Sequence, residues 1–304
     1  MYQNILITGG TGLLGTNWAI SQQASSKIVL ACHKREIVIS NVISEVVDLN
    51  SVNEIKSIMK REEIDLVINT AGYTNVESCE KYPTEAKNVN TTIPENLAIA
   101  SQELKIKLIH ISTDHLFDGI SSFCSEDKEP RPMNIYAKTK HKGEKAILYN
   151  SEDALIIRTN FFGWGPLYRR SFSDFIIDNL RKKNTISLFT DVLFTPVSIS
   201  NLIRTTHELI LKNVSGIINI ASDERISKYD FGLKLAKAFD LDCNLIRASE
   251  IEDRKDLIPR PKDLSLSNTK ARKILNRQLG SIDLQIEDLL SEASNGLEEK
   301  INSF

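Results

Sequence analysis

The chain has 304 residues, which is enough to bury a large core in one domain or in two unequal ones. Its 38 basic and 40 acidic residues give a formal net charge of −2, so the composition lacks the basic excess that nucleic acid or an anionic membrane attracts. The four cysteines lie far apart without a CxxC pair, so neither a zinc cluster nor a disulfide framework is indicated, and no metal is expected.

The N-terminal residues run directly into an apolar strand, without the charged and apolar regions of a signal peptide. The sequence also lacks an apolar stretch long enough to span a bilayer. We therefore expect a cytoplasmic protein with reduced thiols that binds neither nucleic acid nor membrane. A homodimer is compatible with the sequence, and the sequence does not fix the oligomeric state.

Short apolar runs alternate with helical patterns through the first half of the chain. The runs predicted to be strands are residues 4–8, 27–33, 45–49, 65–70, 107–112 and 154–159. The segments between them, such as 51–63 and 94–105, have helical composition and spacing. This alternation predicts a parallel sheet covered by helices on both faces, with ligands at the carboxyl ends of its strands.

The regular alternation stops after residue 165, and the remainder is mostly helical and polar apart from a short strand at 216–222. We therefore expect an α/β fold: a Rossmann-type doubly wound parallel sheet with a smaller, mostly helical C-terminal substrate lobe. The expected boundaries are 1–165 with a return segment at 195–222 for the dinucleotide-binding domain, and 166–194 with 223–304 for the substrate-binding lobe.

The first strand runs into the sequence TGGTGLLG, which places three glycines in a GxxGxxG spacing between a strand and a helix. Glycines there permit a tight turn and let the backbone approach a pyrophosphate, which sits at the N-terminus of the helix. Glycine also marks ordinary turns, but its position after the first strand favours dinucleotide binding. The residues expected to contact the cofactor here are Gly9, Gly12, Leu13, Leu14 and Gly15.

Further cofactor contacts are expected at the ends of the next strands. Lys34 and Arg35 follow the second strand and suit a 2′-phosphate, which favours NADP (as NADPH) over NAD unless they form a basic surface turn. Asp48 and Leu49 end the third strand and are expected near the adenine. The sequence NTAGYT ends the fourth strand, and its residues expected on the nicotinamide side are Thr70, Ala71, Gly72 and Tyr73.

Tyr136 and Lys140 are four residues apart in a predicted helix, so their side chains share one helix face. A free tyrosine has a pKa of about 10, and a neighbouring ammonium lowers that value, which makes the phenol a usable acid or base. Such a pair arises often by chance. Here it follows a glycine loop and a strand ending in Ser112 and Thr113, whose hydroxyls can complete a catalytic group.

The chain resembles an extended short-chain dehydrogenase/reductase of the dTDP-4-dehydrorhamnose reductase family. The motifs that carry the resemblance are TGGTGLLG, NTAGYTNVESCE, HISTDHLFDG, NIYAKTKHKGEKA and RPKDLSLSNTK. It implies an NAD(P)H-dependent reductase that transfers a hydride to the C4 ketone of an NDP-4-keto-6-deoxy sugar. Tyr136 would then protonate the developing alkoxide, Lys140 would hold the cofactor ribose and tune Tyr136, and Thr113 would bind near the carbonyl.

The resemblance also implies substrate contacts, at Asp114, His115, Phe161, Thr195 and Arg260. The family typically has Tyr in place of His115 and Trp near Phe161, so these departures leave the identity of the sugar open. A rim histidine without a chemical role is an equal alternative for His115. Arg260 lies between two prolines, where its guanidinium suits phosphate oxygens but also fits a rigid surface loop.

Three alternatives share the fold. Sugar 4,6-dehydratases usually carry Thr-Asp-Glu, and His115 in place of the Glu argues against dehydration. A C4-epimerase fits the Tyr-Lys pair, but Thr113 with Asp114 resembles the reductases better. The regulatory beta subunit of methionine adenosyltransferase also resembles this chain and keeps the Tyr-x-x-x-Lys pattern, so a non-catalytic, NADP-binding partner protein stays open.

Overall fold

A seven-stranded sheet forms the centre of one of two structural units in the computed structural model, which describes residues 2–33 and 35–304. The first unit comprises Met1–Leu116, Pro132–Arg158 and Ile210–Ile218, and the second comprises Phe117–Arg131, Thr159–Leu209 and Asn219–Phe304. Residues 117–131, 159–165, 195–209 and 219–222 were predicted to belong to the dinucleotide-binding domain, whereas here they group with the second unit.

The sheet of the first unit has the strand order β11-β6-β5-β4-β1-β2-β3. Its strands are β1 (Asn4–Thr8), β2 (Lys27–Cys32), β3 (Val42–Val46), β4 (Leu66–Asn69), β5 (Lys107–Ile111), β6 (Leu155–Arg158) and β11 (Gly216–Asn219). Neighbouring strands from β3 through to β6 pair in parallel. The prediction of a Rossmann-type doubly wound parallel sheet is confirmed, and the strand order reverses at the boundary between β1 and β4.

The predicted position of the third strand was wrong by three residues. The strand was predicted at residues 45–49, whereas β3 spans Val42–Val46. This strand lies at the edge of the sheet, so Ile43 and Val46 are 40% and 51% exposed, while Val47 beyond its end is buried. The apolar pattern therefore continues past the exposed edge strand to the buried Val47, which shifted the predicted strand toward the C-terminus.

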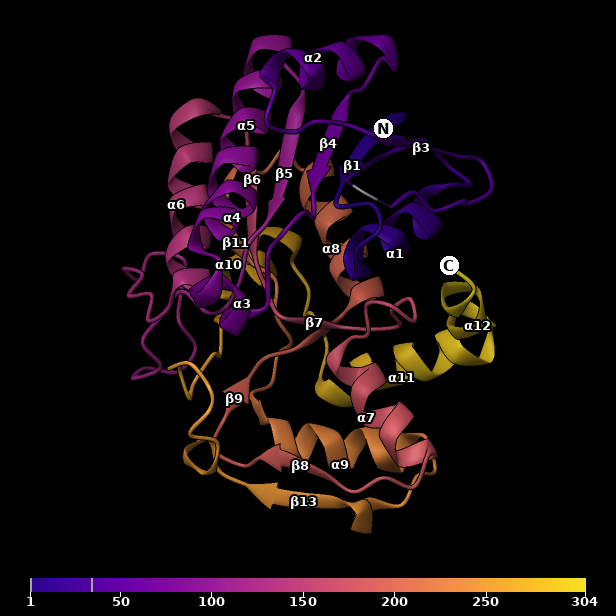
Figure 1. The fold of residues 1–304 in the computed structure, drawn as a ribbon, viewed down its shortest axis with the longest axis vertical. Helices are drawn as coiled ribbons and strands as arrows, with labels where there is room; N and C mark the ends of the chain where they lie inside the picture. The colour runs from indigo at the N-terminus through magenta and orange to yellow at the C-terminus, as the bar shows by residue number, and fades with distance from the viewer. Residues whose placement is uncertain (1, 34) are drawn as a thin grey trace. The chain divides into compact units, whose positions relative to one another are not determined.

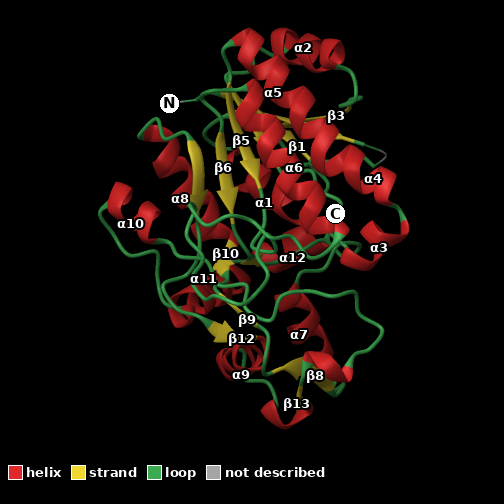
Figure 2. Ribbon diagram, turned by 90° about the vertical axis from the view of Figure 1, so that its left-hand side faces the viewer, coloured by secondary structure: helices red, strands yellow, loops and turns green. Residues whose placement is uncertain are grey.

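The helices of the first unit connect these parallel strands (Figure 1). They are α1 (Leu13–Gln22), α2 (Val52–Arg61), α3 (Val76–Lys81), α4 (Pro83–Lys87), the π-helical turn η1 (Asn88–Thr92), α5 (Ile93–Leu104) and α6 (Ile135–Asn150). Figure 2 shows α5 and α6 running alongside the strands of the sheet. The side-chain cap of Ser51 at α2 and that of Asn134 at α6 fix where these two helices begin.

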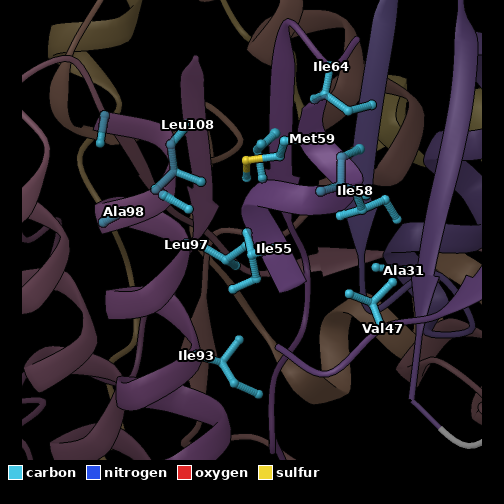
Figure 3. Packing of buried hydrophobic residues seen from close by; sticks show 14 of the residues in the cluster. Ala31, Val47, Ile55, Ile58, Met59, Ile64, Ile93, Leu97, Ala98 and Leu108 are labelled. Carbon is cyan, nitrogen blue, oxygen red and sulfur yellow. The ribbon is translucent and has the colours of Figure 1, made fainter. Parts of the chain in front are cut away.

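The core of the first unit lies between one face of the sheet and the helices α2, α5 and α6. Figure 3 shows Ile55, Ile58 and Met59 of α2 packed with Leu97 of α5 and Leu108 of β5. Leu6, Val67 and Leu108 point to this face from three neighbouring strands, so residues two positions further along each strand point the same way. The opposite face receives α1, whose Trp18 is fully buried.

The second unit contains three small two-stranded sheets rather than one large one. Their strands are β7 (Phe161–Phe162) with β10 (Val197–Ser198), β9 (Leu193–Phe194) with β12 (Ile226–Ser227), and β8 (Ile186–Phe189) with β13 (Ile246–Ser249). The helices are α7 (Phe172–Arg181), α8 (Ile199–Leu211), α9 (Lys228–Ala238), α10 (Thr269–Leu275), α11 (Ile282–Ser294) and α12 (Leu297–Asn302), with short 3₁₀ turns at Cys243–Leu245 and Ile251–Asp253.

In the second unit α9 lies beside β8 and β13 (Figure 1). A Cβ atom at Gly232 would come within 2.2 Å of Leu188, so the glycine permits this close approach. Among residues 2–33 and 35–304, none of the helices combines the length and the hydrophobicity needed to cross a bilayer.

Candidate active site

The glycine loop lies where the sheet order reverses, at the carboxyl end of β1. Gly9 has φ +67°, and a Cβ atom there would lie 2.7 Å from the backbone nitrogen of Ala71. A Cβ atom on Gly15 would lie 2.5 Å from the carbonyl oxygen of Gly9. The positions therefore require glycine, because the loop, the helix and the end of β4 meet backbone against backbone.

Gly12 is the N-cap of α1, which has no side-chain cap and no acidic residue in its first turn. Leu13 and Leu14 open this helix, so their backbone N–H groups belong to the set that an α-helix leaves without intrahelical partners. A helix N-terminus of this kind favours an anion such as a pyrophosphate. The residues present thus fit the phosphate end of a dinucleotide.

The loop after β4 contains Thr70, Ala71, Gly72 and Tyr73, which are all half-buried. The hydroxyl of Thr70 donates to the carbonyl of Thr8 at 2.7 Å, which ties this loop to the strand that carries the glycines. The residues expected on the nicotinamide side and the glycine loop are therefore brought together at neighbouring strand ends.

The expected adenine and 2′-phosphate contacts lie at the ends of β2 and β3. Arg35 is an exposed residue shortly after β2, and Lys34 lies outside the described residues. Asp48 is exposed two residues after β3, where hydrogen bonds from the backbone and side chain of Asn50 lower the pKa of its carboxyl group. Leu49 packs against the core instead of standing free in solvent.

Tyr136 and Thr113 form the centre of the expected catalytic group. Tyr136 lies in the first turn of α6, which begins where the Asn134 side chain accepts a hydrogen bond from the backbone of Ala137. Thr113 lies two residues beyond β5, and its side chain lies close enough to influence the pKa of the Tyr136 phenol. The two residues are 4% and 8% exposed, so the phenol and the threonine hydroxyl meet in a largely desolvated position.

The protonation expected for Tyr136 needs correction. Burial is the largest influence and raises the pKa of Tyr136 above its ordinary value, and the carboxylate of Asp114 and the thiol of Cys79 raise it further. The Thr113 side chain acts on the pKa of Tyr136 in the opposite direction but is outweighed. The expected net lowering of the Tyr136 pKa by the Lys140 ammonium is therefore wrong, and the phenol stays protonated at neutral pH.

Lys140 lies one helical turn after Tyr136, and its side chain is directed to the end of β5. Its Nζ donates to the carbonyl of Ile111 at 2.6 Å and lies 3.2 Å from Nε2 of His110. Burial lowers the pKa of Lys140 to about 8, although the charge of Glu144 opposes this shift. His110 was not among the predicted site residues, and its signal in the sequence is a single histidine inside the apolar run KLIHIS.

Ser112 was expected to offer a hydroxyl to the catalytic group, but it faces a different partner. Its Oγ donates to Oε1 of Glu144 at 2.5 Å. Glu144 also accepts two hydrogen bonds from the guanidinium of Arg158, at 3.0 and 2.8 Å, and all three residues are buried. This ion pair was missed because α6 and β6 come together only in the folded sheet. Of Ser112 and Thr113, Thr113 is therefore the residue whose hydroxyl remains expected at the catalytic group.

The spacing between α6 and the preceding segment is set by backbone contact. A Cβ atom on Gly143 would lie 2.2 Å from the carbonyl oxygen of Asn90 in η1. The Asn90 side chain in turn accepts from the backbone of Tyr73, at 2.9 Å, and donates to the hydroxyl of Thr139 at 3.1 Å. Asn90 therefore connects the loop after β4 to the helix that carries Tyr136.

Asp114 and His115 follow Thr113 in the first unit. Asp114 is 2% exposed, and His115 is half-buried with its Nε2 3.9 Å from Oδ1 of Asp114. The His115 ring lies edge-on to the Tyr136 ring, with 5.6 Å between centroids. The structure therefore brings both residues to the phenol that we expect to act on the sugar.

The remaining expected substrate residues belong to the second unit. Phe161 is half-buried in β7, where it pairs with Val197. Thr195 is buried, and its hydroxyl accepts a hydrogen bond from the backbone of Leu266 at 3.1 Å. Arg260 is half-buried and donates from Nε to the carbonyl of Ile258 at 3.1 Å.

A group of carboxylates that the sequence analysis did not consider also lies in the second unit. Asp191, Glu250 and Glu252 have carboxylate oxygens within 4.8 Å of one another. The ammonium of Lys262 contacts Asp191 at 3.0 Å and Glu252 at 2.5 Å, so two of the three carboxylates already have a cationic partner.

The model of the RmlD substrate binding domain family matches residues 3–295. A probable low-salt glycan biosynthesis reductase, Agl14, from Haloferax volcanii is 32% identical over 292 residues, which cover 94% of this chain and 95% of the relative. Methionine adenosyltransferase 2 subunit beta from Xenopus tropicalis is 28% identical over 278 residues, which cover 88% of this chain and 81% of the relative.

Among solved structures, a hypothetical dTDP-4-dehydrorhamnose reductase from Sulfolobus tokodaii has a TM-score of 0.81 and 28% identity. The match covers 93% of this chain and 99% of that chain. These comparisons confirm the family resemblance that the sequence motifs indicated.

Proposed function

The chain belongs to the RmlD substrate-binding-domain family, and from this premise we propose that it is an NADPH-dependent reductase of an NDP-4-keto-6-deoxy sugar. The observation that carries the proposal is the buried phenol of Tyr136, which the ring of His115 approaches edge-on. It lies in the unit that also holds the glycine loop, beyond the carboxyl end of β5. Reductases among the relatives support the reaction class.

The bound nicotinamide would supply the hydride to the C4 carbonyl carbon, and the protein would supply the proton for the carbonyl oxygen. Tyr136 suits this role because burial and Asp114 raise its pKa, so the phenol carries its proton at neutral pH. Thr113 lowers the pKa of the phenol, so it would favour release of this proton. Product formation leaves a tyrosinate, which must regain a proton before the next turnover.

Cofactor binding would use the N-terminus of α1 and its glycines, with Thr70, Ala71, Gly72 and Tyr73 on the nicotinamide side. Arg35 is exposed after β2 and supports a preference for the 2′-phosphate of NADPH. Lys140 would hold the ribose, and the substrate contacts would come from Asp114, His115, Phe161, Thr195 and Arg260.

The test is consumption of NADPH, then of NADH, with a panel of NDP-4-keto-6-deoxy sugars. Tyr136→Phe removes the proton donor and keeps the ring, and we expect kcat to fall about 10²- to 10⁴-fold with cofactor binding retained. Tyr149→Phe is the matched control, because Tyr149 lies on the same helix but is 89% exposed. Full turnover by Tyr136→Phe would refute the assigned proton donor.

A regulatory subunit is the second candidate, because a relative named as methionine adenosyltransferase 2 subunit beta matches nearly as much of the chain as the reductase relative does. Cofactor binding without turnover of any sugar, together with co-purification of an unrelated subunit, would favour this candidate over the reductase.

A further inference from the structure

A row of buried polar side chains crosses the sheet and ends at Lys140. Thr8, Asn69 and His110 are register partners on the neighbouring strands β1, β4 and β5, and all three are fully buried. Each lies two residues after a member of the apolar core, so the row faces the side of the sheet that α6 covers. Their side chains are linked by contacts of 2.7 Å between Thr8 and Asn69 and 2.9 Å between Asn69 and His110.

The direction of these hydrogen bonds is fixed at Asn69. Its Oδ1 accepts from the backbone N–H of Ala71 at 3.1 Å and from the hydroxyl of Thr8 at 2.7 Å. A backbone N–H can only donate, so the atom that faces it is the amide oxygen. The amide nitrogen of Asn69 therefore faces Nδ1 of His110, and Nδ1 must be the acceptor.

A neutral imidazole that accepts at Nδ1 carries its proton on Nε2. Nε2 of His110 lies 3.2 Å from Nζ of Lys140, so its N–H points at the lysine nitrogen. An ammonium group has three donors and no lone pair, whereas a neutral amine can accept this hydrogen bond and still donate to Ile111. The contacts around Lys140 are thus complementary to its neutral form.

We propose that Asn69 and His110 are positioning residues that hold Lys140 as a neutral amine while its side chain lies against β5. Asn69 fixes the tautomer of His110, and His110 supplies the hydrogen bond that only the amine accepts. Protonation of Lys140 removes this contact, so the ammonium form is favoured only when the side chain leaves His110 for another partner.

The consequence for catalysis rests on the proposed function. After Tyr136 has given its proton to the sugar oxygen, an ammonium at Lys140 can return a proton to the tyrosinate and become the amine. The amine then rests on His110 until it takes a proton from water. His110 and Asn69 transfer no proton themselves; they set which form of Lys140 is stable in this position.

The surrounding charges agree with this arrangement. Burial lowers the pKa of His110 well below its usual value, with the Lys140 charge adding to the effect, so the ring stays neutral. On α6, Glu144 is the carboxylate that favours an ammonium at Lys140, and it is already paired with Arg158 of β6. Further ionisable groups nearby are Tyr136 of α6, Asp114 beyond β5, and Cys79 and Glu80 of α3, and on α6 the ring of His141 lies 3.9 Å from the Glu144 carboxylate.

The first experiment reads the tautomer directly, by two-bond ¹H–¹⁵N correlation spectra of the protein labelled with ¹⁵N-histidine. The His110 signals are assigned from the His110→Phe spectrum. We expect the Nε2–H tautomer of His110 both below and above neutral pH. The His110 chemical shifts should change near pH 8 as Lys140 titrates, and this change should be absent in Lys140→Met. An Nδ1–H tautomer, or an imidazolium, would overturn the proposal.

The second experiment reverses the direction of the hydrogen bond between residue 69 and Nδ1 of His110. In Asn69→Asp, a carboxylate oxygen faces Nδ1, which must then donate, so Nε2 becomes an acceptor for an ammonium. We expect the Nδ1–H tautomer of His110 and a titration midpoint of Lys140 that is raised by about 1–3 pH units. A raised midpoint with the tautomer unchanged would assign the effect to charge alone and contradict the proposed role of His110.

Thr8→Val is the matched control, because the Ala71 N–H still orients the Asn69 amide in that variant. It should keep the Nε2–H tautomer, and a changed tautomer would refute the role given to Ala71 and Asn69. Both spectra need no substrate, so the absence of sugar turnover would refute the reductase and leave this result intact. If turnover is found, the alkaline limb of the pH profile of kcat/KM should shift to higher pH in Asn69→Asp, together with the titration midpoint of Lys140.

Discussion

Two ionisable side chains lie one helical turn apart on α6, and their surroundings differ. Glu144 is 1% exposed, and its carboxylate forms an ion pair with Arg158 and accepts a hydrogen bond from the hydroxyl of Ser112. Lys140 is 3% exposed, and its Nζ contacts the backbone carbonyl of Ile111 and the imidazole of His110. The first arrangement stabilises a charge in one state, whereas the second lets a group change its protonation near physiological pH. Equal burial therefore accompanies two different roles.

The largest effect is expected when the Glu144 pair is broken. Arg158→Met leaves a buried carboxylate without its cationic partner, and we expect the free energy of unfolding to fall by about 3–5 kcal/mol. Urea unfolding at neutral pH measures this loss. The double variant Glu144→Leu with Arg158→Met should recover most of it, since an apolar pair leaves no buried charge. A loss below about 1 kcal/mol in the single variant would mean that water reaches Glu144.

An intermediate effect, visible mainly as a pH dependence, is expected at Lys140. Its pKa falls from an ordinary 10.5 to about 8 in the folded protein, so the unfolded chain binds more protons between these values. The penalty for the buried ammonium is fully present below pH 8, about 3 kcal/mol at most, and disappears as the pH rises to 10.5.

The measurement is the unfolding free energy of the wild type minus that of Lys140→Met across this pH window. We expect this difference in unfolding free energy to rise with pH, because the folded wild type becomes more stable as Lys140 loses its proton. Subtraction of the variant removes the titration of other groups. A flat difference would show that Lys140 keeps an ordinary pKa.

The smallest effect is expected from an ion pair of similar length at the surface. Lys56 of α2 and Glu103 of α5 are 2.7 Å apart, close to the 2.8 Å between Arg158 and Glu144, but their side chains are 25% and 52% exposed. We expect Glu103→Gln to change the unfolding free energy by less than about 1 kcal/mol in urea titrations. A loss comparable to that of Arg158→Met would show that distance, and not burial, determines the strength of these pairs.

The parts of the fold and site that could be predicted depend on local patterns. The spacing of Gly9, Gly12 and Gly15 and that of Tyr136 and Lys140 are properties of one turn or one helix, so sequence alone indicates them. Continuous apolar runs likewise located the central strands. The edge strand β3 was misplaced because its exposure breaks the apolar pattern.

The polar row could not be predicted in the same way, since Asn69 and His110 are 41 residues apart and meet only through the register of β4 and β5. Each strand does carry a signal, in that one polar residue interrupts an apolar run near the strand's carboxyl end. Reading the three strands together would have aligned these residues. The pKa of Tyr136 was misjudged because burial, which the sequence does not reveal, outweighs the influence of a neighbouring charge.

The contact between Gly143 and the carbonyl of Asn90 has a practical meaning for redesign of the enzyme. The separation between α6 and η1 is set by main-chain atoms, which side-chain substitutions elsewhere leave in place. Residues around the phenol, such as His115, can therefore be exchanged to test the proposed substrate site without changing the contact that positions the helix carrying Tyr136. Position 143 itself admits no such exchange, because any side chain there would push the helix outward.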